Sequence, residues 1–256
     1  MRSFLAFFKK ELLESARSGK LLFLSILFFA FGVMNPAIAK LTPWLLEIMA
    51  GELAESGMIV TEVTVDALTS WTQFFKNIPM ALIAFVLMYG GVFTKEYESG
   101  TLLLMLTKGL ARYKVLLAKA LLLFSLWSLG YFLCFGVTYA YNAYFWDNSA
   151  AKSLMPAVVN YWLFGVWVIC LAVLFSVLAK SSSSVLLGTG AGALAAYLLS
   201  FLPKVKAYTP ASLTESAGLL SGAAEAADYA KAALVTAVLC LAFLAASVPI
   251  FNKKDI

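Results

Sequence analysis

Long apolar runs alternate with short polar stretches along most of this 256-residue chain. Each run has about the 20 residues that an α-helix needs to cross a bilayer, and none alternates in polarity as barrel strands do. Backbone groups inside hydrocarbon must also be hydrogen-bonded within the chain, which favours helices. The pattern predicts an all-α integral membrane protein, a single transmembrane domain over residues 1–256. Its six expected spans are residues 21–39, 78–94, 115–139, 156–179, 184–202 and 232–250.

Residues 1–20 precede the first expected span and repeat apolar residues at helical spacing. This pattern predicts an amphipathic helix on the membrane surface. A charged tail that only sets the topology is the alternative. The motif Ala37-Ile38-Ala39 has the shape of a signal-peptide cleavage site, but the patterned stretch before it leads us to expect that the segment is retained. The expected apolar face holds Phe4, Phe7, Phe8, Leu12 and Leu13, and the expected polar face holds Lys9, Lys10, Glu11 and Glu14.

Residues 203–231 are too polar to span a membrane and too apolar for a free linker. They contain Thr209-Pro210, Gly218 and Gly222 among many alanines. These features predict a short re-entrant or surface helical hairpin on the outer side.

Composition agrees with a membrane protein. Hydrophobic residues make up 62% of the chain, charged residues make up 13%, and the mean hydropathy is +0.88. A soluble domain carries about 25% charged residues. The 19 basic residues exceed the 14 acidic ones, but they are scattered in short loops and form no basic stripe, so we expect no nucleic-acid partner.

The basic residues predict the orientation instead. Thirteen of them fall on the side that holds both termini and six on the other side. The positive-inside rule therefore places both termini in the cytoplasm. We expect a multi-pass protein of a cell membrane, in contact with membrane lipids. The membrane we expect is the cytoplasmic membrane of a prokaryote.

Several chemistries are disfavoured by what the sequence lacks. It contains no histidine, and Cys134, Cys170 and Cys240 stand singly in apolar runs, so we expect no metal site and no catalytic residue. No GxxxxGK[ST] phosphate-binding motif occurs, so the chain is expected to carry no cofactor of its own. The expected spans are nearly free of ionisable residues, and Lys119 is the main exception. This scarcity disfavours an ion-coupled carrier, which usually needs ionisable groups near the middle of the membrane.

The polar segment 95–114, between the second and third expected spans, is the most distinctive part of the chain. It contains Glu96-Tyr97-Glu98-Ser99-Gly100-Thr101, then Lys108-Gly109-Leu110-Ala111-Arg112, and Lys119 follows it. This arrangement resembles the cytoplasmic signature of type-2 ABC-transporter permeases: two acids, a Gly-Thr pair, an arginine and a lysine. It departs from that family at Gly109, where a proline is common, and near Leu103, where a further acid is common. Physically, Gly100 releases the backbone, and a short apolar run follows it.

The resemblance implies a function and a set of partners. Segment 95–114 would form a coupling helix seated in a separate ABC ATPase subunit, which would bind the ATP and Mg²⁺. The permease would act as a dimer, with a second copy or a paralogue, and would export an amphipathic molecule such as a peptide, drug, lipid or glycan precursor. The residues implied in coupling are Glu96, Glu98, Gly100, Thr101, Arg112 and Lys119.

Gly188 and Gly192 lie four residues apart in the fifth expected span. Small residues at this spacing allow membrane helices to approach closely. Packing within one bundle and a dimer contact are both compatible with the pattern.

Two other classes of function stay open at this point. One is a membrane-embedded enzyme that modifies lipids, and the other is a non-transporting sensor or immunity protein. Paired intramembrane acids or a histidine would favour the enzyme, and a large additional domain would favour the sensor. The sequence shows neither feature.

Overall fold

The computed structural model describes residues 2–55, 65–94, 96, 100–102, 107 and 110–254. Every regular element in these ranges is helical. Six of the helices are long and apolar enough to cross a membrane. The prediction of an all-α protein with six membrane-spanning helices is therefore confirmed. The long helices are α2 (Lys20–Glu55), α3 (Ala67–Tyr89), α6 (Arg112–Phe145), α7 (Leu154–Leu178), α8 (Ser182–Ser200) and α11 (Ala230–Lys253).

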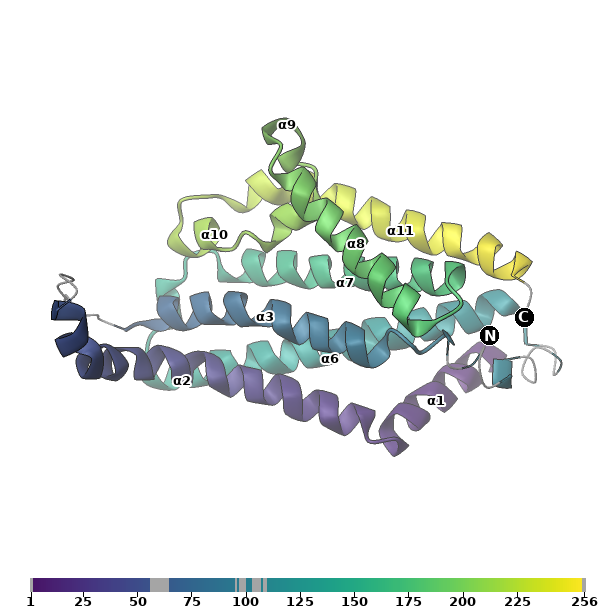
Figure 1. The fold of residues 1–256 in the computed structure, drawn as a ribbon, viewed down its shortest axis with the longest axis horizontal. Helices are drawn as coiled ribbons and strands as arrows, with labels where there is room; N and C mark the ends of the chain where they lie inside the picture. Colours follow the sequence, from purple (N-terminus) through teal and green to yellow (C-terminus); the bar gives the residue numbers. More distant parts are fainter. Residues whose placement is uncertain are drawn as a thin grey trace.

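Shorter elements occupy the ends of this bundle. Helix α1 (Arg2–Arg17) precedes α2, and Gly19 between them adopts φ +73°, a conformation that glycine accepts without strain. Figure 1 shows α1 set at an angle to α2 beside both chain termini. The remaining short elements are η1 (Asn148–Ala150), α9 (Pro203–Lys206), η2 (Pro210–Thr214), α10 (Ala217–Ser221) and η3 (Ala226–Tyr229).

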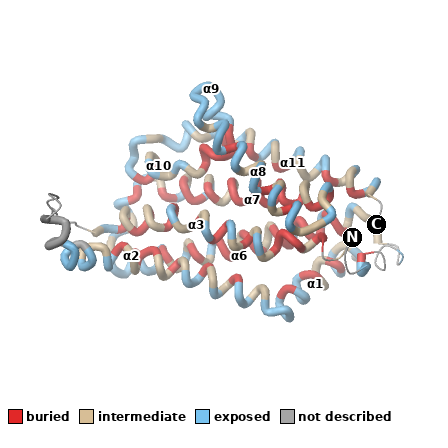
Figure 2. The backbone as a smooth tube through the Cα atoms, in the orientation of Figure 1, coloured by how far each residue is buried: buried red, intermediate tan, exposed pale blue. Residues whose placement is uncertain are grey.

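The long helices pack in layers, with α3, α6 and α7 between α2 on one side and α8 and α11 on the other (Figure 1). Helix α2 packs against α3 and α6, and α7 packs against α6, α8 and α11. Helix α8 crosses α7 obliquely on the outside of the bundle (Figure 1). Buried positions concentrate along α3, α6 and α7, whereas α8, α9 and the end of α2 remote from the termini are largely exposed (Figure 2). We call the end with both termini the terminal end and the opposite end the distal end.

Two helices differ in extent from the apolar runs in the sequence. Helix α2 continues past residue 39 to Glu55, and α3 begins at Ala67 rather than at residue 78. Asp66 fixes this earlier start, because its carboxylate accepts a hydrogen bond of 2.9 Å from the Thr69 backbone N–H. Charged residues end an apolar run but do not end a helix. The backbone hydrogen bonds therefore continue through Lys40 and Lys76.

Residues 203–231 form short helical turns at the distal end. Residues 210–213 are buried, and α9 projects away from the bundle (Figure 1). Backbone hydrogen bonds join this segment to the start of α7: Lys152 N–H donates to the Leu220 carbonyl at 3.2 Å, and Ser153 N–H donates to the Leu219 carbonyl at 3.3 Å. These contacts fix the segment to the bundle, and its depth in a membrane stays a prediction.

Candidate functional site: the ion-pair cluster at the terminal end

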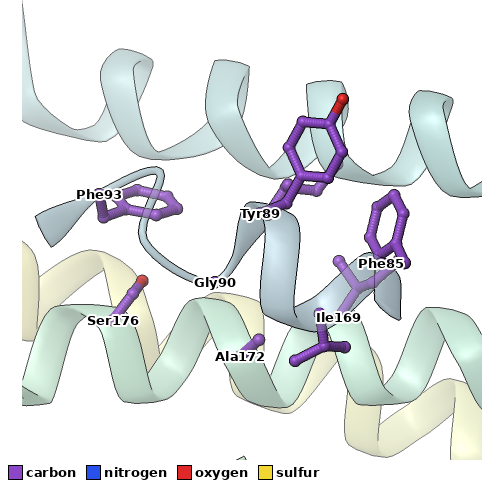
Figure 3. Close-up of a pocket in the computed structure, with 9 residues that line it drawn as sticks. Phe85, Tyr89, Gly90, Phe93, Ile169, Ala172 and Ser176 are labelled. Carbon is purple, nitrogen blue, oxygen red and sulfur yellow. The ribbon is translucent and has the colours of Figure 1, made fainter. Parts of the chain in front are cut away.

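The site begins where α3 ends. The chain leaves the helix at Gly90, forms a turn, and reaches Glu96. The aromatic side chains just before this turn point away from α7: the Phe85 ring contacts Trp127 of α6, and the Tyr89 hydroxyl reaches Ser15 of α1 (Figure 3). Figure 3 shows Phe85, Tyr89, Gly90 and Phe93 of this region beside Ile169, Ala172 and Ser176 of α7.

Lys119 of α6 stands at the centre of the cluster. Its Nζ lies 2.8 Å from Glu11 Oε2 and 3.0 Å from Glu96 Oε1, and it donates to the Val92 carbonyl at 3.3 Å. The Lys119 side chain is only 2% exposed. One ammonium group therefore joins α1, the turn after α3, and α6.

Lys10 supplies a second positive charge. Its Nζ lies 2.9 Å from Glu11 Oε1, 2.8 Å from Glu14 Oε2 and 3.7 Å from Glu96 Oε1. The cluster of Lys10, Glu11, Glu14, Glu96 and Lys119 is called the ion-pair cluster below. Its lysines share two carboxylates, so removing one member changes several contacts at once.

The pKa values of the two shared carboxylates are shifted in opposite directions. Burial opposes ionisation of Glu11, but the ammonium groups of Lys119 and Lys10 together outweigh it and hold the pKa of Glu11 below its usual value. Burial raises the pKa of Glu96, because the attraction of Lys119 only partly offsets it and the charge of Glu11 adds repulsion. Glu96 Oε2 is buried and accepts no hydrogen bond from the described part of the chain. Glu96 is therefore the less satisfied of the two carboxylates.

A small polar cavity of about 70 Å³ adjoins the cluster. Glu11, Glu96 and Lys119 line it together with Ser15 and Tyr89. The hydroxyl groups of Ser15 and Tyr89 lie 3.1 Å apart and form a second link between α1 and α3. Helix α1 is thus anchored to the bundle by a neutral hydrogen bond as well as by ion pairs.

A hydroxyl pair joins the same turn to α8. Thr94 Oγ1 lies 2.6 Å from Ser182 Oγ, and Thr94 is fully buried. Ser182 is the first residue of α8. The turn that carries Glu96 therefore contacts α8 as well as α1 and α6.

Arg112 lies at the start of α6 and binds a different group. Its Nη1 donates to the carbonyl oxygens of Phe251 and Asn252, each at 3.2 Å, and of Lys254 at 2.5 Å. Lys254 Nζ donates to the Ala179 carbonyl at 2.6 Å, at the end of α7. A cation at a helix C-terminus satisfies free carbonyl groups and complements the helix dipole. These two residues join the start of α6 to the end of α11, and the end of α11 to the end of α7.

The structure thus divides the residues implied in coupling. Glu96 and Lys119 meet in the ion-pair cluster, whereas Arg112 binds the end of α11. Gly100 has φ +67°, in keeping with the predicted release of the backbone there, and Thr101 follows it in a helical conformation. Glu98 and most of segment 95–109 lie outside the described residues, so the predicted coupling helix stays a prediction.

Gly188 and Gly192 both face α7 of the same chain. A Cβ atom on Gly188 would stand 2.4 Å from Phe175 Cδ1, and one on Gly192 would stand 2.5 Å from Leu171 Cδ2. Packing within one bundle, one of the two alternatives, accounts for this contact. A role for these glycines in a dimer stays a prediction.

Sequence reasoning missed the α1 half of the cluster. The expectation that Glu11 lies on an exposed polar face is wrong: Glu11 is 5% exposed, whereas Leu12 and Leu13 are 37% and 44% exposed. Glu11 stands four residues after the buried Phe7, so both lie on one helix face. Lys119, a lone cation in an apolar run, was the signal that an acid from elsewhere must face it.

The described residues contain no group of three or more metal-ligating side chains, and Cys134, Cys170 and Cys240 are free and buried.

Comparison with known proteins identifies the family. The family model described as "ABC-2 family transporter protein" matches residues 5–199. The chain belongs to this family. It is also 24% identical, over 254 residues, to the uncharacterized transmembrane protein YxlG of Bacillus subtilis (strain 168). That alignment covers 96% of this chain and 95% of the relative. The protein is therefore a multi-pass ABC-transporter permease, and ABC-2 permeases in general work with an ABC ATPase.

Proposed function

We propose that this permease forms half of an export path and is driven by a separate ABC ATPase that docks on segment 95–114. The observation that carries the proposal is the burial of Lys119 between Glu11 and Glu96. Glu96 lies at the start of the segment on which the ATPase would dock. A push on that segment would therefore reach α6 and α1 through one ammonium group.

Electrostatics explains why such a link would transmit motion. Separating buried opposite charges leaves each one unpaired in a medium of low dielectric constant, which typically costs about 3–5 kcal/mol. The turn, α1 and α6 are thereby favoured to move together. The Thr94–Ser182 hydroxyl contact extends the same link to α8.

Helix α8 borders a groove suited to an export path. The groove has a volume of about 380 Å³ and lies between α3 and α8 over α7. Its lining is mainly apolar and includes the polar residues Tyr161, Thr189 and Tyr197. Such a lining suits an amphipathic cargo such as a peptide, drug, lipid or glycan precursor. A second permease, a copy or a paralogue, would complete the path.

The remaining assignments follow the same proposal. ATP and Mg²⁺ are assigned to the partner ATPase, and catalysis occurs there. The terminal end faces the cytoplasm, as the distribution of basic residues favours. Helix α1 would then lie at the cytoplasmic surface of the cell membrane, where its exposed Leu5, Leu12 and Leu13 meet lipid.

Co-purification of the permease with its ATPase tests the docking site. Glu98→Lys is the preferred variant, because Glu96→Lys would put a lysine beside Lys119 and Lys10 and disturb the bundle itself. Loss of a desolvated charged partner costs about 2–5 kcal/mol, so Glu98→Lys is expected to release most of the ATPase. Lys204→Glu, an exposed change at the distal end, is the matched control. Unchanged ATPase binding by a folded Glu98→Lys permease would contradict the proposed docking site.

A further inference from the structure

Helix α2 contains a proline whose backbone defect is repaired by another helix. Pro36 lies inside α2 and has no N–H, so the carbonyl group of Gly32, four residues earlier, loses its usual helical donor. Thr138 of α6 replaces that donor: its hydroxyl donates to the Gly32 carbonyl at 3.0 Å. Membrane helices tolerate proline where a Ser or Thr hydroxyl satisfies the freed backbone group in this way.

Gly32 also brings the two helices close enough for this contact. A Cβ atom at Gly32 would lie 2.8 Å from Val137 Cβ and 3.0 Å from the Cys134 carbonyl oxygen. The second contact is with backbone, which cannot rotate away as a side chain can. The absence of a side chain at Gly32 therefore allows α6 to approach, and the proline at position 36 frees the carbonyl group that α6 then binds.

Two amide side chains extend the contact to a third helix. Asn77 Nδ2 of α3 donates to Asn35 Oδ1 at 2.9 Å, and Asn35 Nδ2 donates to Thr138 Oγ1 at 3.2 Å. The single hydroxyl proton of Thr138 is used toward Gly32, so the bonds run in one direction from Asn77 to Gly32. Asn35 and Thr138 are 1% and 0% exposed.

We propose that this hydrogen-bonded relay is a lock that controls the bending of α2 at Pro36. Its members are Asn77, Asn35, Thr138 and the Gly32 carbonyl. While the relay is closed, the freed carbonyl is satisfied and α2 is joined to α3 and α6. When it opens, the helix lacks a backbone bond at Pro36, so the part of α2 beyond this residue can swing.

Exposure beyond the lock is consistent with such a swing. Leu41, Trp44 and Ile48 are 51%, 56% and 61% exposed, so this part of α2 has a large surface that does not pack on the bundle. A swing there would change the distal end without moving the ion-pair cluster. Neither the ATPase nor the cargo is needed for such a swing.

A double-mutant cycle tests the repair of the proline defect. Thr138→Val keeps the shape of the side chain and removes the hydroxyl, and we expect the Tm in detergent to fall by about 2–4 °C. Pro36→Ala restores the N–H that binds the Gly32 carbonyl. Thr138→Val is therefore expected to lower the Tm clearly less in the Pro36→Ala background than in the parent chain. Equal losses in both backgrounds would overturn the inference.

The control is another fully buried threonine. Thr236 Oγ1 donates to the Ala232 carbonyl of its own helix at 2.6 Å, so Thr236→Val removes a hydroxyl without breaking a link between helices. Thr236→Val is expected to lower the Tm by the same amount in the parent chain and in the Pro36→Ala background.

A distance measurement tests the swing itself. Spin labels are placed at Ile48 of α2 and Tyr144 of α6, both exposed, in a chain that lacks Cys170 and Cys240. Cys134 is kept, because it is fully buried and its Sγ lies 4.0 Å from Asn35 Nδ2. We expect Thr138→Val to broaden the distance distribution, Pro36→Ala/Thr138→Val to narrow it again, and Thr236→Val to leave it unchanged. Asn77→Ala, which releases α3 but keeps the bond to Gly32, is a second variant if Thr138→Val folds poorly, and we expect partial broadening. An unchanged distribution in whichever of these two variants folds would overturn the lock.

Discussion

Polar side chains join separate segments both at the terminal end and in the middle of the bundle, but the two regions use different chemistry. At the terminal end, Glu11, Glu96 and Lys119 bring full charges together under α1. In the middle, Asn35, Asn77 and Thr138 use neutral amides and a hydroxyl. Both sets join three segments that are distant in the sequence, and each has two buried members, Glu11 and Lys119 or Asn35 and Thr138, and one partly buried member, Glu96 or Asn77.

The difference follows from the cost of leaving a group unpaired. An unpaired buried charge costs several kcal/mol, whereas an unpaired amide or hydroxyl costs about 1–3 kcal/mol. A charged link therefore resists separation, which suits segments that must move together. A neutral link opens at a smaller cost, which suits a place where a helix bends. The following predictions test this contrast, beginning with the largest expected effect.

Removing the central cation should cause the greatest loss. Lys119→Met keeps a long side chain but leaves Glu11 and Glu96 buried without their main partner, so we expect the free energy of unfolding in detergent to fall by about 3–5 kcal/mol. Thermal and denaturant unfolding measure the loss. Lys76→Met, at an exposed lysine of α3, should stay within about 0.5 kcal/mol of the parent. Similar losses in the two variants would mean that the cluster has no special role in stability.

Two glycines test the neutral region. Gly32→Ala inserts a methyl group against the Cys134 carbonyl oxygen at 3.0 Å, and such overpacking costs about 1–3 kcal/mol. Gly136→Ala on α6 meets no atom within 4 Å and should be neutral or stabilising by up to about 1 kcal/mol, because alanine favours the helix. The difference in Tm between the two variants is the measurement. A Gly32→Ala chain as stable as Gly136→Ala would show that α2 and α6 do not need this close approach.

The pH dependence of stability should separate the two shared carboxylates, with the smallest effect of the three. The pKa of Glu11 is held below 4.5, so its stabilising contribution is present above pH 4.5 and is lost as the pH falls further. The Tm difference between the parent and Glu11→Gln should therefore shrink below pH 4.5. Glu47→Gln, at an exposed position of α2, should show no such change.

Glu96 should behave in the opposite sense. Its pKa is raised above 4.5, so its ionised form opposes folding at higher pH, and the parent should gain stability relative to Glu96→Gln as the pH falls toward 4.5. Parallel pH profiles for Glu11→Gln and Glu96→Gln would contradict the different environments of the two groups.

Much of the architecture was predictable because hydrophobic periodicity and length constrain membrane helices strongly. The six apolar runs identified the six long helices, and the polar segment between the second and third runs indicated the family. Lys119 was recognisable as an unusual charge. Its partner Glu11 was not, because a single sequence does not show which face of α1 turns toward α6.

The neutral relay was equally hidden. Gly32, Asn35 and Pro36 look like ordinary interruptions of an apolar run, and Thr138 looks like one of several threonines. Their structural role is recognisable only in the folded chain, where α6 lies beside α2 and the Thr138 hydroxyl reaches the Gly32 carbonyl group that Pro36 leaves without a donor.

The sequence by itself determined the membrane environment, the helical class and the number of long helices, because the bilayer requires each crossing segment to be apolar and internally hydrogen-bonded. Only the tertiary structure decided which polar groups are paired. The carboxylate partners of Lys119 lie 108 and 23 residues away in the sequence, and the side-chain partners of Asn35 lie 103, 99 and 42 residues away. Pairing over such separations depends on how the helices rotate and pack, and local propensity carries no information about either.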